Sequence, residues 1–449
     1  MTHQSNLARA TDLRSVRLGL LGCGTVGSAL VGLIDNVKEA VAAEHGLALV
    51  VSKVAVQDPK KHKNLPKECI SIDPVSVATS PDVDIVVELM GGISPAKESV
   101  EAALRSSKPV VSANKALISR HLPALAELSK SCDSSLFFDA AVAGAVPVIS
   151  TLRASSAVLG VNSFLGVVNG TTNFILSMMR SSGCSFDEAL SMAKSLGFAE
   201  QDPSADVLGH DAAAKAALLA ALGFRVDVSP SAVYTTPLDR VVPADHLTAS
   251  RLDRVVKPVV VGSFDGSSVS LASFPALVPS NHKLASASFA ENILILKTTH
   301  AADLVFAGPG AGGSPTATAV LADILRVAAS EGSTRRTAPL GPFTPTPIAE
   351  PAPLRTMLPV WFYDAQSGLS EVLGLLDRLG LTVESFTEEP ASSLPTDPLA
   401  PGPSITPAPL PRYVFTLAPA PITVLLGLLD RLASCKEVLA LGQLYRFLD

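Results

Sequence analysis

An aspartate and a lysine lie one helical turn apart in an otherwise apolar segment. Asp211 and Lys215 are four residues apart in HDAAAKAALLAALGF (210–224), so a helix places both on one face. On an exposed helix such a pair contributes only about 0.3 kcal/mol. The surrounding alanines and leucines instead indicate a buried helix, in which a lone lysine points into a site. An ammonium group there can donate a proton to an oxygen that gains negative charge when a carbonyl group is attacked. His210 beside this pair is interpreted as structural.

Two helices and the loop between them must position this pair. Ser185 and Glu188 have the spacing of a capping box, which predicts a helix that starts near Phe186 and stops at Gly197. Glu200 follows in the loop, and a second helix is expected from about 205 to 222, before a glycine at 223. FDAAVAGAVPVI (138–149) and GVVNGTTNFILSMM (166–179) carry further specific signals.

A glycine-rich loop follows the first apolar strand of the chain. The strand at 16–21 leads into Gly22-x-Gly24-x-x-Gly27, and a helical pattern begins at Ser28. In this context the glycines allow a tight turn, a close approach to a pyrophosphate, and close packing of helix and strand. The helix N-terminus adds N–H donors for phosphates. The loop therefore predicts a dinucleotide-binding site.

Later strands of the same pattern end in polar or glycine residues. The strand at 49–56 is followed by Gln57 and Asp58 and then by Lys60 and Lys61, a mixed signal that leaves NAD and NADP open. The strand at 83–92 ends in a Gly91-Gly92 pair. Another strand ends just before Asn114 and Lys115, at the edge where parallel sheets bind ligands.

Composition narrows the class of protein. The chain has 449 residues, a net charge of −6, 47% hydrophobic and 17% charged residues, which excludes a disordered acidic protein and predicts two or three domains. Its longest basic run, 60–63, argues against nucleic-acid binding. No apolar run of about 18 residues and no secretory signal are present, so we expect a cytoplasmic protein without a membrane span. Five scattered cysteines fit a reducing compartment.

The composition changes after about residue 340. Of the 34 prolines, 17 fall between Pro339 and Pro421. The segment 336–354 is expected to be a linker, and 388–411 a disordered insertion or long loop. The sequence LLDRL occurs at 375–379 and again at 428–432 within two strand–helix–strand patterns. These patterns predict a small βαββαβ domain interrupted by the proline-rich insertion.

The chain resembles the homoserine dehydrogenases. The resemblance rests on GCGTVG (22–27), VELMGG (87–92), SANKALIS (112–119), FDAAVAGAVP (138–147), NGTTNFIL (169–176), GFAEQDPSADVLGHDAAAK (197–215) and GPGAGGSPTATAVLADI (308–324). These segments span nearly all of residues 16–330 in the order of the family. The family reaction is the reversible, NAD(P)H-dependent reduction of L-aspartate 4-semialdehyde to L-homoserine, a step of threonine, methionine and isoleucine biosynthesis.

The resemblance implies a role for each matching residue. Lys215 is implied to exchange the proton with the substrate oxygen, and Lys115 to be a second active-site lysine. The implied substrate-binding residues are Glu200, Asp211, Asp206 and Thr171. The implied cofactor-binding residues are Gly22, Gly24, Thr25, Val26, Gly27, Gln57, Gly91, Lys115, Gly197 and Gly312. A monovalent cation, Na⁺ or K⁺, is implied at Asp139, Val142, Gly144 and Val146. This sequence departs from the family at two positions: the family usually has Glu where Asp139 stands, and often Arg where Gln57 stands.

The resemblance also implies a fold and a domain order. The fold class is α/β, with a Rossmann-type NAD(P)-binding domain at 14–150 joined by a helix region at 308–335. An α+β catalytic and dimerisation domain at 151–307 follows. The linker at 336–354 leads to a regulatory domain at 355–449 that resembles an ACT domain, although its first turn lacks the Pro-Gly of that family. Threonine is its possible effector, dimer contacts are an equal alternative, and a homodimer or homotetramer is expected.

Two other functions were weighed against this one. A catalytically inactive NAD(P)- and amino-acid-binding regulatory protein is disfavoured because Lys115, Glu200, Asp211 and Lys215 are all present. An aspartate-semialdehyde dehydrogenase needs a cysteine nucleophile, and no cysteine here has a supporting histidine at a suggestive spacing.

Overall fold

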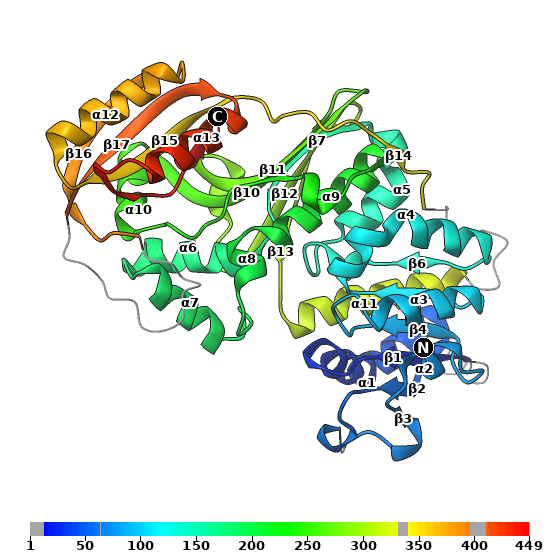
Figure 1. The fold of residues 1–449 in the computed structure, drawn as a ribbon. Coiled ribbons are helices and arrows are strands. Elements are labelled where there is room, and N and C mark those ends of the chain that lie inside the picture. Colours follow the sequence, from blue (N-terminus) through cyan, green and yellow to red (C-terminus); the bar gives the residue numbers. More distant parts are fainter. Residues whose placement is uncertain (1–12, 63, 331–339, 396–409, 449) are drawn as a thin grey trace, which may run out of the picture. The chain divides into compact units, whose positions relative to one another are not determined.

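The computed structural model describes residues 13–62, 64–330, 340–395 and 410–448, which form two compact units (Figure 1). Unit 1 is the described part of Met1–Ser156 and Ala311–Thr344, and unit 2 is the described part of Ala157–Gly310 and Pro345–Asp449. Residues 336–339 of the expected linker and 396–409 of the expected insertion lie outside the described residues. Among the described residues, no helix combines the length and apolar character that crossing a membrane requires.

Unit 1 is built on a parallel sheet with the strand order β3-β2-β1-β4-β5-β6. The order reverses beside β1, and open parallel sheets bind ligands at the carboxyl ends of the strands where this happens. The α/β class and the Rossmann-type sheet are thereby confirmed. The strands are β1 (Arg14–Leu21), β2 (Leu47–Ala55), β3 (Ile70–Ser71), β4 (Ile85–Glu88), β5 (Val110–Ser112) and β6 (Leu136–Phe137).

Helices cover this sheet and bury its apolar strands. Leu18 of the first strand, Leu30 of the first helix and Val320 of the last helix are fully buried in one core. The last helix comes from the segment after residue 310, which belongs to unit 1 again. The helices are α1 (Thr25–His45), α2 (Pro74–Thr79), α3 (Ala96–Arg105), α4 (Lys115–Ser131), α5 (Val148–Leu159, which crosses the boundary between the units) and α11 (Gly313–Ser330).

Unit 2 contains a large mixed sheet with the strand order β13-β12-β7-β10-β11-β19-β15-β17-β16. Two further strands pair outside this path, β9 with β11 and β18 with β15. The strands are β7 (Val161–Val167), β8 (Val226–Asp227), β9 (Tyr234–Thr235), β10 (Arg254–Phe264), β11 (Val269–Pro279), β12 (Glu291–Thr298), β13 (Asp303–Pro309), β15 (Leu354–Phe362), β16 (Val383–Ser392), β17 (Leu410–Ala420), β18 (Val438–Leu441) and β19 (Tyr445–Phe447), and β14 (Thr344–Pro345) lies at the boundary of the units.

The helix expected at 205–222 is two helices. The first, α8 (Ser204–Val207), ends before Gly209, which has φ of 79° and breaks the helix because other residues rarely adopt this conformation. The second, α9 (His210–Phe224), is buried from Asp211 onward, as its run of alanine and leucine indicated. The other helices before the tail are α6 (Gly170–Ser182), α7 (Phe186–Ser195, with the expected capping box) and α10 (Pro243–Arg251).

The C-terminal part of unit 2 follows the order β15, α12 (Ala365–Arg378), β16, β17, α13 (Ile422–Ala433), β18 (Figure 1). Both copies of LLDRL reach into these two helices. The last strand, β19, pairs with β11 on one side and β15 on the other, so it joins this part to the rest of the sheet. The expectation of a loop over 388–411 is wrong at its ends: residues 388–392 belong to β16 and 410–411 to β17, because these strands pair as far as Ser392 and Leu410.

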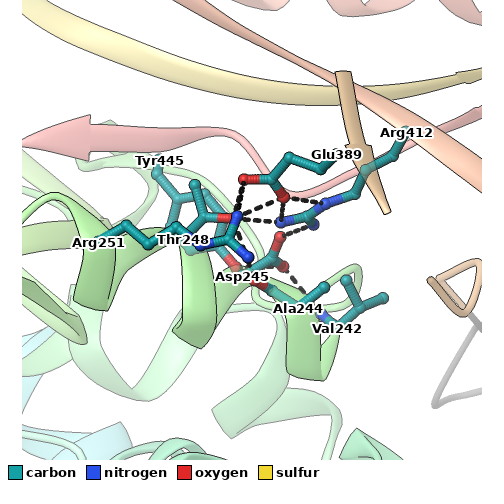
Figure 2. A network of polar contacts seen from close by, with 8 residues as sticks. All are labelled: Val242, Ala244, Asp245, Thr248, Arg251, Glu389, Arg412 and Tyr445. Atoms are coloured by element: carbon teal, nitrogen blue, oxygen red, sulfur yellow. Dashed lines mark hydrogen bonds and ion pairs between the residues drawn. The ribbon is translucent and has the colours of Figure 1, made fainter. Parts of the chain in front are cut away.

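A buried cluster of charged residues joins this C-terminal part to helix α10 (Figure 2). Arg412 of β17 donates to Asp245 at 2.5 Å and to Glu389 of β16 at 2.8 Å. Its Nη2 also donates to the Thr248 hydroxyl at 2.5 Å, and the Tyr445 hydroxyl donates to Asp245 at 2.7 Å. Arg412 and Asp245 are both completely buried. Two C-terminal strands, β16 and β17, therefore meet helix α10 through charged side chains, and a third, β19, through the Tyr445 hydroxyl.

Helix α10 also carries a buried histidine that makes stability depend on pH. Neither ring nitrogen of His246 has a hydrogen-bond partner among the described residues. Burial, with the positive charges of Arg180 and Lys257, lowers the pKa of His246 to about 4. The unfolded chain therefore binds a proton between pH 6.5 and 4 that the folded chain does not, so stability falls as the pH falls through this window. The total loss is about 3 kcal/mol.

Urea unfolding between pH 7 and pH 4.5 measures this effect. We expect the His246→Gln variant to lose less stability over this range than the wild type, because glutamine does not titrate. Identical slopes for the two proteins would show that His246 does not carry the effect.

Candidate active site

The glycine-rich loop of unit 1 joins β1 to α1 and contains two glycines, Gly22 and Gly27, at which a side chain would not fit. Gly22 has φ of 97°, which is strained for any other residue. A Cβ atom on Gly27 would lie 2.8 Å from the carbonyl oxygen of Gly22, so the helix can approach the strand only without one. A Cβ on Gly24 would meet no described atom within 4 Å, so its backbone faces open space. Thr25 and Val26 form the first turn of α1, whose N–H groups suit a phosphate.

A pocket of about 380 Å³ opens at the carboxyl ends of these strands. Four of the cofactor residues implied by the resemblance line it: Gly22, Gly24, Gln57 and Gly91. Together with the loop geometry, this pocket fits a dinucleotide with its pyrophosphate at the start of α1.

The segment after β2 supplies the charged side of this pocket. Asp58, Lys61 and His62 all line it. Asp58 caps the short 3₁₀ helix η1 (Pro59–Lys61), and its Oδ1 accepts a hydrogen bond from the Lys60 backbone N–H at 3.0 Å. One carboxylate oxygen of Asp58 is thus used to stabilise the local turn, whereas the basic side chains of Lys61 and His62 line the pocket.

A buried carboxylate organises the ends of β4 and β5. Glu88 is fully buried and accepts hydrogen bonds from the Ser112 hydroxyl at 2.7 Å and the Asn114 amide at 3.3 Å. Burial raises the pKa of Glu88. Asn114 caps α4 and donates to the carbonyl of Gly92 at 2.7 Å. Lys115 is therefore fixed as the exposed first residue of α4, at the strand end where the sequence placed it.

The predicted lysine and aspartate of unit 2 form a buried ion pair. Lys215 Nζ lies 2.8 Å from Asp211 Oδ2, and the side chains are 8% and 1% exposed. The same ammonium donates to the carbonyl oxygen of Val168 at 2.7 Å. The interpretation of an exposed surface pair is therefore wrong, and the apolar surroundings of α9 explain why.

Asn169 connects this pair to a second carboxylate. Its side-chain oxygen caps α6 by accepting the Thr172 N–H at 2.8 Å. Its amide nitrogen donates to Asp206 Oδ1 at 2.7 Å and to Asp211 Oδ2 at 2.8 Å. The two aspartates thus converge on one amide beside Lys215.

The remaining predicted residues of unit 2 differ in how they relate to this cluster. The Thr171 hydroxyl donates to the carbonyl of Phe198, which holds the loop after α7 against the start of α6. Gly197 has φ of 78° in this loop. Glu200 is exposed, and no contact between it and the cluster is seen in the described structure. His210 is exposed at the first position of α9.

The predicted cation loop and Gly312 belong to unit 1. Gly144 has φ of 60°, and the carbonyl of Val146 accepts the N–H of residue 148 at 2.8 Å. The Asp139 carboxylate binds Arg326 at 2.8 Å. Arg326 therefore already neutralises the carboxylate of the first predicted cation-binding residue. Gly312 has φ of 117° and directly precedes α11.

No role of Asn169 or Val168 was predicted from the sequence. Asn169 follows the end of β7 and starts a helix, and an Asn-Gly-Thr sequence at a strand–helix junction is typical of a capping residue. That spacing could have identified the cap, but not its contacts with two distant aspartates. The Val168 contact uses a backbone carbonyl, which no residue type reveals.

The unit 2 cluster can perform acid–base chemistry on a carbonyl group or an alcohol. The Lys215 ammonium has three N–H bonds, of which one goes to Asp211 and one to Val168. The third can donate to a substrate oxygen. A dinucleotide site in unit 1 supplies the redox half of such a reaction.

The family models that match this chain, a relative and two solved structures all carry the name of one family. The family model "Homoserine dehydrogenase, NAD binding domain" matches residues 22–139, and the model "Homoserine dehydrogenase" matches residues 147–325. The homoserine dehydrogenase of Mycobacterium leprae is 41% identical over 323 residues, covering 71% of this chain and 73% of that protein.

Two solved structures are similar over most of the chain. A homoserine dehydrogenase from Thiobacillus denitrificans has a TM-score of 0.83 at 26% identity and covers 97% of this chain and 99% of its own. A hyperthermophilic archaeal homoserine dehydrogenase in complex with NADPH has a TM-score of 0.60 at 25% identity, covering 72% of this chain and 100% of its own.

Proposed function

This chain belongs to the homoserine dehydrogenase family, and from this premise we propose how its residues carry out the reaction. It is an NAD(P)-dependent enzyme that interconverts L-aspartate 4-semialdehyde and L-homoserine. The observation that carries the proposed mechanism is the buried ion pair of Lys215 and Asp211 on the carbonyl of Val168.

Lys215 is proposed as the acid in reduction and the base in oxidation. The bound nicotinamide supplies or accepts the hydride at the substrate carbon. As the aldehyde oxygen gains negative charge, the third N–H of Lys215 stabilises it and transfers a proton to give the hydroxyl group. In the reverse direction the neutral amine takes the hydroxyl proton. Asp211 and Val168 hold the amine in one orientation, which contributes to the rate through positioning.

We propose that the substrate is held by the carboxylates and hydroxyl group around this amine. Asp206 shares the Asn169 amide with Asp211, so both acids can face the amino and hydroxyl groups of homoserine. Thr171 holds the loop that leads to Glu200, the third proposed acid. For Lys115 we propose the role of second active-site lysine.

We propose that the enzyme prefers NADP(H) to NAD(H). Enzymes that use NAD place a free carboxylate at the end of the second strand, where it binds the ribose hydroxyls. Here Gln57 is neutral and one oxygen of Asp58 caps a turn, whereas Lys61 and His62 line the pocket. A 2′-phosphate suits this basic wall, and NADPH is the ligand of the archaeal relative.

The remaining predictions are kept as proposals. We propose that the carbonyl groups of the 142–146 loop bind a monovalent cation. We further propose that residues 355–449 form an ACT-like regulatory domain that binds an amino acid such as threonine, and that the enzyme is a homodimer or homotetramer. The βαββαβ order of the described C-terminal residues supports the proposal of an ACT-like domain.

Homoserine oxidation with each cofactor tests the proposed function. We expect turnover with both cofactors and a kcat/KM for NADP at least about tenfold higher than for NAD, the value of one charged contact. Lys61→Ala should remove most of this preference. Lys60→Ala is the matched control, because Lys60 is exposed and does not line the pocket. Equal use of the two cofactors by the wild type would contradict the proposed preference, and absence of turnover would contradict the mechanism.

A further inference from the structure

The carbonyl oxygen that holds Lys215 is shared with a second side chain. Val168 O accepts the Lys215 ammonium at 2.7 Å and the amide of Asn292 at 3.3 Å. Asn292 is the second residue of β12, which pairs with β7 beside Val168, and it is 1% exposed. A carbonyl oxygen has two lone pairs, so these two donors together can fix its direction.

The Asn292 amide lies directly against Gly310, and the backbone conformation of Gly310 does not itself require a glycine. A Cβ atom on Gly310 would lie 2.2 Å from the Asn292 amide carbon and nitrogen. Gly310 does not have a positive φ, so its backbone permits alanine. The space that the absent side chain leaves is therefore occupied by the amide of Asn292.

A side chain of helix α6 binds the segment that carries Asn292. Asn173 on α6 donates to the carbonyl oxygens of Phe289 at 2.8 Å and Glu291 at 3.1 Å. Buried Lys257 donates to the Asn173 side-chain oxygen at 3.3 Å. The same helix begins at Asn169, the cap that binds the two aspartates, so α6 connects the segment of Asn292 with the carboxylates beside Lys215.

The amide of Asn292 is costly to bury. Its Oδ1 is buried without a hydrogen-bond partner among the described residues. An orphaned polar atom of this kind destabilises a fold, and an apolar residue would avoid the cost. Retention of the amide is therefore explained by its N–H donor, which reaches the Val168 carbonyl.

We propose that Asn292, seated on Gly310, is a positioning residue for Lys215 through the carbonyl of Val168. The proposal rests on the proposed acid–base role of Lys215. Asn292 does not contact the substrate in this scheme. Without this donor the carbonyl keeps only its contact with Lys215, and the orientation of the amine is held less firmly.

Steady-state kinetics of three single variants test the proposal. Asn292→Ala removes the donor, Asn292→Asp keeps the shape without an N–H donor, and Gly310→Ala displaces the amide from outside. We expect each to lower kcat for homoserine oxidation by about 10- to 100-fold, the usual effect of a small misplacement of a reacting group. The KM for NADP should stay within about twofold of the wild type, since uniform binding is unchanged.

The double variant Asn292→Ala/Gly310→Ala is the decisive protein. Its kcat should match that of Asn292→Ala alone, because the new methyl group then has nothing to displace. Gly427→Ala is the matched control: it adds a methyl in α13, where no described atom lies within 4 Å, and should leave kcat unchanged.

Three results would overturn the proposal: Gly310→Ala with wild-type kcat, multiplicative losses in the double variant, or Asn292→Asp with wild-type kcat. Loss of activity in Lys215→Ala together with any of these results would leave the proposed function standing and reject only the role of Asn292. A circular dichroism melt of each variant verifies that it folds. If Asn292→Ala or Gly310→Ala does not fold, Asn292→Asp takes its place in the comparison.

Discussion

Replacing Lys215 by alanine should lower kcat for homoserine oxidation by at least about a thousandfold, while the KM for NADP changes little. General acid–base groups contribute about 10²- to 10⁴-fold, and this amine also stabilises the charge on the substrate oxygen. The cofactor loop lies in unit 1 and Lys215 lies in unit 2, so the substitution leaves the residues of the glycine-rich loop unchanged. Stopped-flow and steady-state absorbance of the nicotinamide measure both quantities.

Added primary amines separate a chemical role of Lys215 from a structural one. Removal of this side chain leaves space beside Asp211, which a small amine can enter and use for proton transfer. We expect ethylamine to restore part of the activity of Lys215→Ala and to have no effect on the wild type. Lys283→Ala, which removes an exposed lysine of the same unit, should be fully active. Activity near the wild-type level in Lys215→Ala would reject the proposed mechanism.

The parts of the site that the sequence predicted are those with a local signal. The Gly22–Gly27 loop follows an apolar strand and precedes a helix, so the chain context alone identified it. The spacing of Asp211 and Lys215 within an alanine- and leucine-rich helix likewise indicated a buried pair. In both cases the residues that act together are neighbours in the sequence.

The parts that the sequence did not predict depend on distant partners. Asn292 contacts the Val168 carbonyl across 124 positions, and Arg412 contacts Asp245 across 167. No periodicity or spacing connects such residues, because the pairing depends on the sheet register. The expected loop at 388–411 was wrong at its ends for this reason: Glu389 looks like part of a proline-rich polar segment, yet its carboxylate is buried against Arg412.

Replacing Arg412 by methionine should lower the free energy of unfolding of unit 2 by about 3 to 5 kcal/mol, because it leaves buried charges unpaired. Figure 2 shows the guanidinium between Asp245 and Glu389. Burial raises the pKa of Asp245 even with Arg412 beside it, so the carboxylate is already costly to keep charged. Without the guanidinium this cost is no longer offset.

The single tryptophan of the chain reports on this cluster. Trp361 is fully buried, and the Arg412 guanidinium carbon lies 5.9 Å from the centre of its ring. Urea unfolding followed by tryptophan fluorescence therefore measures the stability of the region that contains the substitution. Arg378→Met is the matched control, because Arg378 is an exposed arginine whose ion pair with Glu371 lies at the surface, and such pairs contribute at most about 1 kcal/mol.

The triple variant Arg412→Met/Asp245→Asn/Glu389→Gln distinguishes unpaired charge from lost packing. It removes the guanidinium together with both carboxylate charges but keeps an oxygen acceptor for the Tyr445 hydroxyl. We expect it to regain at least about half of the stability lost by Arg412→Met, since buried ion pairs replaced as a whole are often close to neutral. If the triple variant is instead less stable than Arg412→Met, the two carboxylates stabilise the junction independently of Arg412. That result would contradict a cluster held together by charge, and it would leave the pairing of β19 between β11 and β15 as the main connection of the C-terminal part to the catalytic sheet.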